Sequence, residues 1–191
     1  MERRELLKLI AAATGAAMIG VPAFVYGQAP APRGNIAFSA DEVAKLDEIA
    51  DTILPRTKTP GAKDAGVGAF MARFVTDCYT PEYQALFRAG LAELDQRAGG
   101  SFVSLSPQRR SELLRTLDGE AGRRVNSMAV ATGGASPNAA KPHYFTMIKQ
   151  LTLFGFFTSQ VGATQALRYV AVPGRYDGAA AYEPGTPAWA T

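Results

Sequence analysis

The sequence predicts an all-α fold, a single domain of about six helices with a non-regular C-terminal tail wrapped on its surface. Three observations lead to this prediction. Apolar residues recur at helical spacing in several segments, helix-start signals precede those segments, and no strand-like alternation is sustained anywhere in the 191 residues. The chain is long enough for one domain that buries about two-thirds of the surface exposed by its unfolded state.

The N-terminus carries an export pattern. An arginine pair precedes two leucines and a lysine, directly ahead of a long uncharged stretch: Arg3, Arg4, Leu6, Leu7 and Lys8. The pattern predicts a twin-arginine signal, which addresses proteins for export after they have folded. The expected location is therefore the periplasm, reached through the twin-arginine translocase.

The uncharged stretch runs to about Tyr26, and small or modest side chains precede the expected cleavage site between Gly27 and Gln28. Its many Ala and Gly residues supply little transfer free energy, which favours cleavage over an uncleaved membrane anchor. We therefore expect a signal at residues 1–27, an extended linker at 28–38 and the helical domain at 39–191.

The first two helices have clear signals. Ser39 and Glu42 form a capping box, and an apolar stripe at helical spacing follows until Pro55 stops the helix. A polar, turn-rich loop comes next. A second stripe then runs over Val67–Cys78, with Asp64 expected in the first turn of that helix.

Two further helices open on Thr80 and Ser106, each followed by proline at the first helical position. The third helix ends at Gly99-Gly100, and the fourth is extended past Gly119 and Gly122, although glycine weakens a helix.

Residues 143–161 are apolar on nearly all sides, as expected of a central buried helix. A shorter helix is expected from Ala163 to about Val170. The Pro- and Gly-rich tail after Val172 cannot be helical.

Charge and cysteine content narrow the possible functions. The net charge is only +3, and the basic pairs Arg109-Arg110 and Arg123-Arg124 alternate with acidic residues, so no nucleic-acid partner is expected. The single cysteine, Cys78, cannot form a disulfide within the chain. It lies in phase with an apolar stripe, which favours burial over a reactive thiol.

The titratable residues offer little for catalysis. His143 is the only histidine, which excludes sites with several histidine ligands, and its place at a helix start favours capping or packing over general-base chemistry. No nucleophile-elbow, phosphate-loop or dinucleotide motif is present. Four carboxylates fit an outward, solvated helix face: Glu42, Asp47, Glu48 and Asp51. We therefore expect no catalytic, cofactor-binding or metal-binding residue in this chain.

Two segments combine turn-forming residues with aromatic or basic residues in a way that helix formation alone does not require. They read ILPRTKTPGAKDAGV at residues 53–67 and LTLFGFFTSQVGATQALRYVAVPGRYDG at residues 151–178. Together with a tail that contains Ala188-Trp189-Ala190, they resemble the gluconate 2-dehydrogenase subunit 3 family over roughly Ser39 to the C terminus. Relatives often carry a cysteine after the Pro-Gly-x-Tyr turn, and this chain departs from them with Gly178-Ala179-Ala180.

The resemblance implies a non-catalytic small subunit of a membrane-associated sugar or polyol dehydrogenase. The large subunit of such complexes is a flavoprotein of the glucose-methanol-choline class, which holds the FAD, and a multihaem cytochrome c often completes the complex with haem c. The small subunit then carries the export signal and escorts the flavoprotein across the membrane. The complex would be peripheral to the inner membrane.

A partner surface is expected on the loop after the first helix and on the tail, where turn-formers accompany aromatic and basic residues common in binding hot spots. The predicted interface residues are Arg56, Thr57, Pro60, Gly61, Arg168, Tyr169, Arg175, Tyr176 and Tyr182. The tail residues fit a role in capping the domain's own core equally well. The alternative function is a stand-alone periplasmic enzyme or small-ligand binding domain, using His143 or a pocket lined by Phe154, Phe156 and Phe157.

Overall fold

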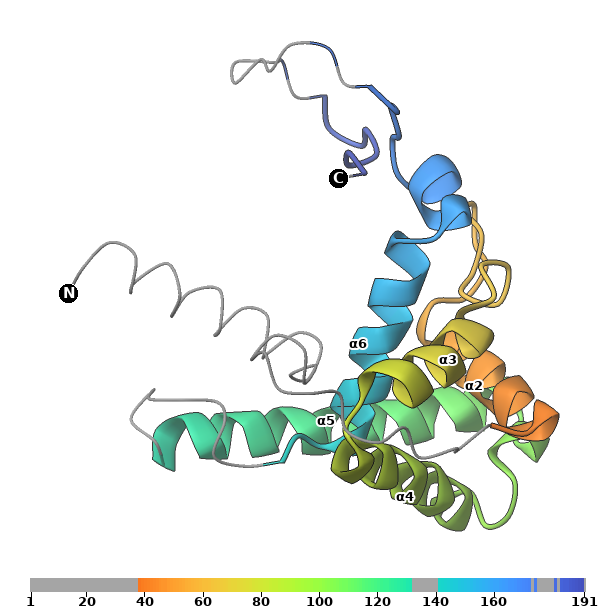
Figure 1. Cartoon of the computed structure of the whole chain (residues 1–191), viewed down its shortest axis with the longest axis vertical. Helices are drawn as coiled ribbons and strands as arrows, with labels where there is room; N and C mark the ends of the chain where they lie inside the picture. Colours follow the sequence, from red (N-terminus) through yellow and green to blue (C-terminus); the bar gives the residue numbers. More distant parts are fainter. Residues whose placement is uncertain (1–37, 132–140, 173, 175–180, 182, 191) are drawn as a thin grey trace.

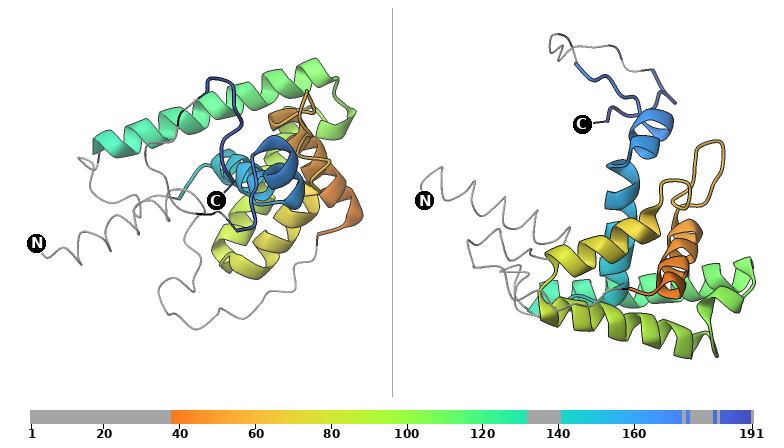
Figure 2. Two further views of the ribbon diagram at one scale, coloured as in Figure 1. Left: turned by 90° about the horizontal axis from the view of Figure 1, so that it is seen from above. Right: turned by 45° about the vertical axis from the view of Figure 1, so that its right-hand side comes forward.

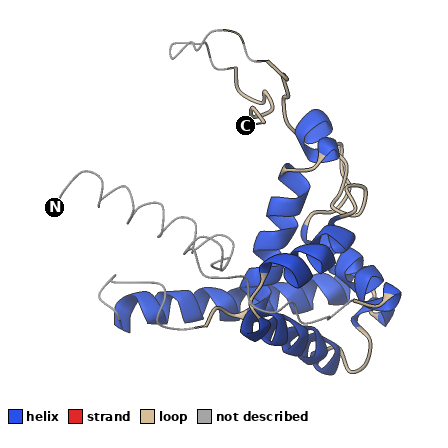
Figure 3. Cartoon of the chain, in the orientation of Figure 1, coloured by secondary structure: helices blue, strands red, loops and turns tan. Residues whose placement is uncertain are grey.

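The computed structural model describes residues 38–131, 141–172, 174, 181 and 183–190, and over these residues it is helical (Figure 3). The elements are α2 Ala40–Ile53, α3 Val67–Cys78, α4 Pro81–Arg97, η2 Phe102–Ser104, α5 Pro107–Ala131, α6 Tyr144–Phe157 and η4 Gly162–Ala166. Strand-like pairing in the described part is limited to one isolated bridge between Arg168 and Trp189. The predicted all-α fold is confirmed, as is the continuation of α5 past its two glycines.

Helix α6 stands at the centre of the molecule and contacts all four other α-helices (Figure 1). Its buried apolar side chains are Tyr144, Phe145, Met147, Ile148, Leu151 and Phe156. Full burial of one such side chain is worth about 1.5–3 kcal/mol, so the packing of α6 is the largest single contribution to the core. The expected central buried helix is therefore present.

Two glycines let neighbouring helices approach α6 closely. At its start, a Cβ on Gly90 of α4 would lie 2.3 Å from Cγ of Tyr144. Near its end, a Cβ on Gly155 would lie 2.6 Å from Cδ1 of Phe70 on α3. Each helix contact thus depends on the absence of a side chain on one partner.

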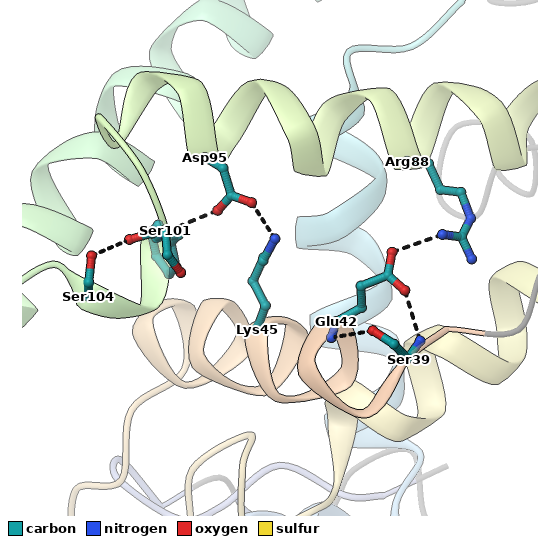
Figure 4. A network of polar contacts seen from close by, with 8 residues as sticks. Ser39, Glu42, Lys45, Arg88, Asp95, Ser101 and Ser104 are labelled. Atoms are coloured by element: carbon teal, nitrogen blue, oxygen red, sulfur yellow. Dashed lines mark hydrogen bonds and ion pairs between the residues drawn. The ribbon is translucent and has the colours of Figure 1, made fainter.

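The carboxylates of α2 accept hydrogen bonds from α3, α4 and α5. The expectation that this acidic face is only solvated is therefore wrong. Glu42 completes the capping box with Ser39 and accepts a hydrogen bond of 2.8 Å from Arg88 on α4. Lys45 of α2 pairs with Asp95 of α4, whose second carboxylate oxygen accepts the N–H that opens η2 at 3.0 Å. Figure 4 shows these contacts joining α2 to α4.

Two further carboxylates of α2 reach past that helix. Asp47 accepts the Gly68 N–H at 2.8 Å and so caps the first turn of α3. Glu48 pairs with Lys63 of the following loop and accepts a 2.5 Å hydrogen bond from Arg110 of α5. The Lys63 hydrogen bond, and then that of Arg110, lowers the pKa of Glu48.

A buried glutamine closes the other end of α3. The side-chain amide nitrogen of Gln84 donates to the carbonyl oxygens of Val75, Thr76 and Tyr79 at 3.0–3.1 Å. Since the last carbonyls of a helix have no partner within it, this amide satisfies groups whose burial would otherwise be costly.

Three predicted boundaries are corrected. Helix α3 begins only at Val67, after Gly66 in the left-handed region (φ 64°), so Asp64 lies in the loop and not in a helical turn. Helix α6 ends at Phe157 and not at Val161, because the hydroxyls of Thr158 and Ser159 donate back to carbonyls of its last turn at 2.6 and 2.7 Å.

The last predicted helix is a single π-helical turn, η4, that ends at Ala166 and not near Val170. The chain leaves the helical conformation there because Arg168 pairs with residues 188 and 190 of the C-terminal segment. In the described part of the chain no helix is both long enough and apolar enough to cross a membrane.

The two kinds of helical glycine are expected to respond oppositely to alanine. Gly90→Ala places a methyl group against Tyr144 and should lower the free energy of unfolding by about 1–3 kcal/mol. Gly122→Ala on α5 meets no atom within 4 Å and should raise it by about 0.5–1 kcal/mol. Urea unfolding followed by circular dichroism measures both, and equal effects of the two substitutions would contradict this packing.

Candidate interaction surface at the end of helix α6

The loop between α2 and α3 is held by its own backbone and by Asp64. The Ala62 N–H donates to the Leu54 carbonyl at 2.9 Å, which closes the loop at its base. Asp64 accepts the Gly61 N–H at 2.8 Å and pairs with Arg56. The Gly61 hydrogen bond and then Arg56 lower the pKa of Asp64, so the loop is tied by a charged carboxylate at neutral pH.

The four interface residues predicted in this loop fall into two groups. Gly61 is buried, and a Cβ at this position would lie 2.6 Å from the backbone nitrogen of Arg56. The turn therefore requires glycine. Pro60 is half-buried beside it, whereas Arg56 and Thr57 are exposed. Only Arg56 and Thr57 therefore present a full side chain to a partner.

The C-terminal end of α6 and the segment beyond η4 expose apolar side chains. Among the residues whose side-chain burial the structure describes, which excludes 125–131, the exposed large hydrophobic residues other than Val103 lie there: Leu153, Phe157, Tyr169, Val170, Val172 and Trp189. Val172 is 83% exposed, and the two aromatic residues of the segment, Tyr169 and Trp189, are each more than half exposed. Because these exposed apolar residues are concentrated in two stretches of the chain that follow one another around η4, we treat this end as the candidate interaction surface.

Arg168 joins the start of this segment to its end. Its N–H donates to the Ala188 carbonyl at 2.8 Å, and its own carbonyl accepts the Ala190 N–H at 2.9 Å. Its guanidinium lies over the Trp189 ring, 3.8 Å from the ring centroid. We call these three contacts the clasp. Residues 188–190, near the end of the tail, therefore pair with Arg168 at its start.

The first predicted interface segment lies close to the point where the second one begins. Figures 1 and 2 place the loop after α2 beside η4 and the C-terminal end of α6. Arg168 and Tyr169, predicted from the sequence, are exposed there. Leu153 and Val172 were not predicted, because a sequence that is apolar on all sides does not reveal which side remains uncovered.

The remaining predicted site residues lie outside the described part of the chain. They are the export residues Arg3, Arg4, Leu6, Leu7 and Lys8, the cleavage residues Gly27 and Gln28, and the tail residues Arg175, Tyr176 and Tyr182.

Of the residues of the alternative site, His143, Phe154 and Phe156 take part in the fold. His143 is the N-cap of α6, where Nδ1 accepts the Phe145 N–H at 3.2 Å. Phe154 packs against Phe70 of α3, with ring centroids 5.8 Å apart, while Phe156 is buried and Phe157 is exposed. The three phenylalanines therefore differ in burial, and the rings of Phe156 and Phe157 contact each other with their centroids 5.1 Å apart.

Cys78 is half-buried in the last turn of α3 and has a free thiol. Burial raises the pKa of this thiol, which lowers the thiolate fraction at neutral pH. Within the described residues no group of three or more His, Cys, Asp or Glu side chains could hold a metal ion.

The family described as gluconate 2-dehydrogenase subunit 3 matches residues 40–174. The chain belongs to this family. The match begins with α2 and includes both the loop after it and the exposed residues Tyr169, Val170 and Val172, but it stops before Trp189. No curated protein and no solved structure is significantly similar to the chain. As a member of the gluconate 2-dehydrogenase subunit 3 family, the chain is a small subunit of a dehydrogenase complex.

The capping role of His143 predicts a pH dependence of stability. Burial lowers the pKa of His143 below its ordinary value of 6.5, and a protonated ring could not accept the Phe145 N–H. The stabilisation is therefore complete above about pH 6.5 and is lost as the pH falls below that value. Urea unfolding between pH 7.5 and 5 should show this decrease.

His143→Asn is the matched control, because asparagine also caps a helix but does not titrate in this range. It should remain close to wild type at pH 7.5 and lose the decrease below pH 6.5. An unchanged decrease in this variant would assign the pH dependence to another group.

Proposed function

We propose that this chain is the non-catalytic small subunit of a periplasmic, FAD-dependent sugar or polyol dehydrogenase. It binds the flavoprotein subunit and escorts it through the twin-arginine pathway. The observation that carries the proposal is the apolar surface at the end of α6, present on a chain whose family is that of a dehydrogenase subunit. Exposure of apolar side chains to water is unfavourable in free energy, and a partner that covers them removes this penalty.

The composition of this surface suits a protein partner. It contains aromatic side chains and an arginine, the residue types most common in binding hot spots, and it has a preformed loop beside it. Aromatic rings supply large contact areas while losing little rotational freedom. The interface is thus expected to centre on Tyr169 and Trp189, with Arg56 and Thr57 at its edge.

The predicted export signal explains why the flavoprotein would associate with this chain. A flavoprotein acquires FAD in the cytoplasm as it folds, so it must cross the membrane folded, and a partner with a twin-arginine signal provides that route. The chemistry then belongs to the large subunit, and a cytochrome with haem c would be the third component. The only histidine of the small subunit is used as a helix cap.

Replacing Arg3-Arg4 by Lys-Lys should leave both this chain and the flavoprotein in the cytoplasm and abolish periplasmic dehydrogenase activity. Cell fractionation with immunoblots for both chains measures the outcome. The matched control replaces the exposed pair Arg123-Arg124 of α5 by Lys-Lys and should leave export unchanged. Continued export of the flavoprotein with the Lys-Lys signal would refute the escort role.

Purification of the exported chain under mild conditions should yield a complex with a larger, flavin-coloured polypeptide, and only that complex should oxidise sugars or polyols. Dye-reduction assays across the column fractions would show activity coinciding with the flavin. Sugar oxidation by this chain without a flavoprotein would instead establish the stand-alone enzyme.

A further inference from the structure

We propose that the clasp between Arg168 and residues 188–190 holds the exposed segment after η4 in the conformation that the flavoprotein subunit binds. The proposal rests on the proposed function and deepens it, because it assigns the partner site to Tyr169, Val170, Val172 and Trp189 and gives the C-terminal residues the task of positioning it. The segment 175–191, which includes half of the clasp, lies beyond the family match.

The geometry of the clasp is specific. Helical structure ends when the Leu167 N–H donates to the Gly162 carbonyl at 2.9 Å, and the next residue begins the bridge. Both backbone groups of Arg168 are used by Ala188 and Ala190, and its side chain covers the ring of the residue between them. Backbone and side chain therefore fix the same register, and a shift by one residue would break all three contacts.

The clasp does little for the helical core. Arg168, Tyr169, Val170 and Trp189 are all exposed, and none of them belongs to the buried cluster around α6. Ordering these residues costs conformational entropy that core burial does not offset. Order in this segment favours binding of a partner. Each side chain that is already held in its bound conformation removes about 0.5–1.5 kcal/mol of ordering entropy from the cost of association.

The charges at this end favour a protein partner over a lipid surface. Arg56 pairs with Asp64, Lys63 pairs with Glu48, and Arg168 stacks on Trp189. Anionic membranes attract surfaces with several free lysines or arginines around an apolar face. Arg56 and Lys63 are paired with carboxylates of the chain, so the loop offers anionic lipid fewer cations than its sequence suggests.

Trp189 is the only tryptophan of the chain, so the fluorescence of the full-length protein reports on the clasp directly. Arg168→Ala should shift the emission to longer wavelength and increase quenching by acrylamide, because the ring loses its cover. Arg115→Ala, at an exposed arginine of α5, is the matched control and should change neither signal.

To measure binding, the flavin-coloured large subunit is immobilised on a surface and the full-length chain is added at increasing concentration. Arg168→Ala and Trp189→Ala should each weaken the affinity about tenfold or more, the size of loss expected at a hot spot. Trp189→Phe should keep most of the affinity, because phenylalanine still offers a ring face to the guanidinium. Circular dichroism and urea unfolding of the helices should match wild type in all of these variants.

Two failures are distinguishable. If wild-type chain does not bind the large subunit, the proposed function fails and the clasp proposal falls with it. If wild type binds but Arg168→Ala and Trp189→Ala bind equally well, only the clasp proposal fails. Clasp-dependent binding to phosphatidylglycerol vesicles, with unchanged affinity for the large subunit, would overturn it in favour of a membrane surface.

Discussion

The burial of α6 among four other helices is the contact on which the rest of the structure depends. Its sequence is apolar nearly all round, so it is stable in water only when other elements cover it. The cover is closest at two glycines, where Tyr144 lies against Gly90 and Phe70 lies against Gly155. It does not extend over the whole helix, since Leu153 and Phe157 remain exposed toward the C-terminal end. The same helix thus forms the core and begins the candidate interaction surface.

Polar contacts fix how the surrounding helices are arranged. Helix α2 presents Glu42, Asp47 and Glu48 to three different elements, and each carboxylate meets a cation or a helix N-terminus. Partly exposed ion pairs of this type contribute modest stability, typically below about 1 kcal/mol each. Their directional geometry selects one arrangement of α2, α3, α4 and α5 around α6, a role that apolar contacts alone perform less well.

The proposed function rests on what these contacts leave uncovered. One end of the molecule carries a tied loop after α2, the exposed end of α6 and the clasped tail, and these segments lie far apart in the sequence. A family of dehydrogenase subunits needs a surface for its partner, and this end supplies apolar area in a preformed geometry. His143 caps α6 and the buried Phe156 packs in the core, so both residues stabilise the helices.

The sequence by itself determined the fold class and most helix starts, because capping signals such as Ser39 with Glu42 and apolar periodicity are local properties. It also indicated the loop around Arg56 and the residues Arg168 and Tyr169, although not that they share one end of the molecule. Tertiary structure alone decided which carboxylates of α2 are used and that Trp189 returns to Arg168. The physical reason is that these outcomes depend on partners distant in the chain, whose positions local periodicity does not encode.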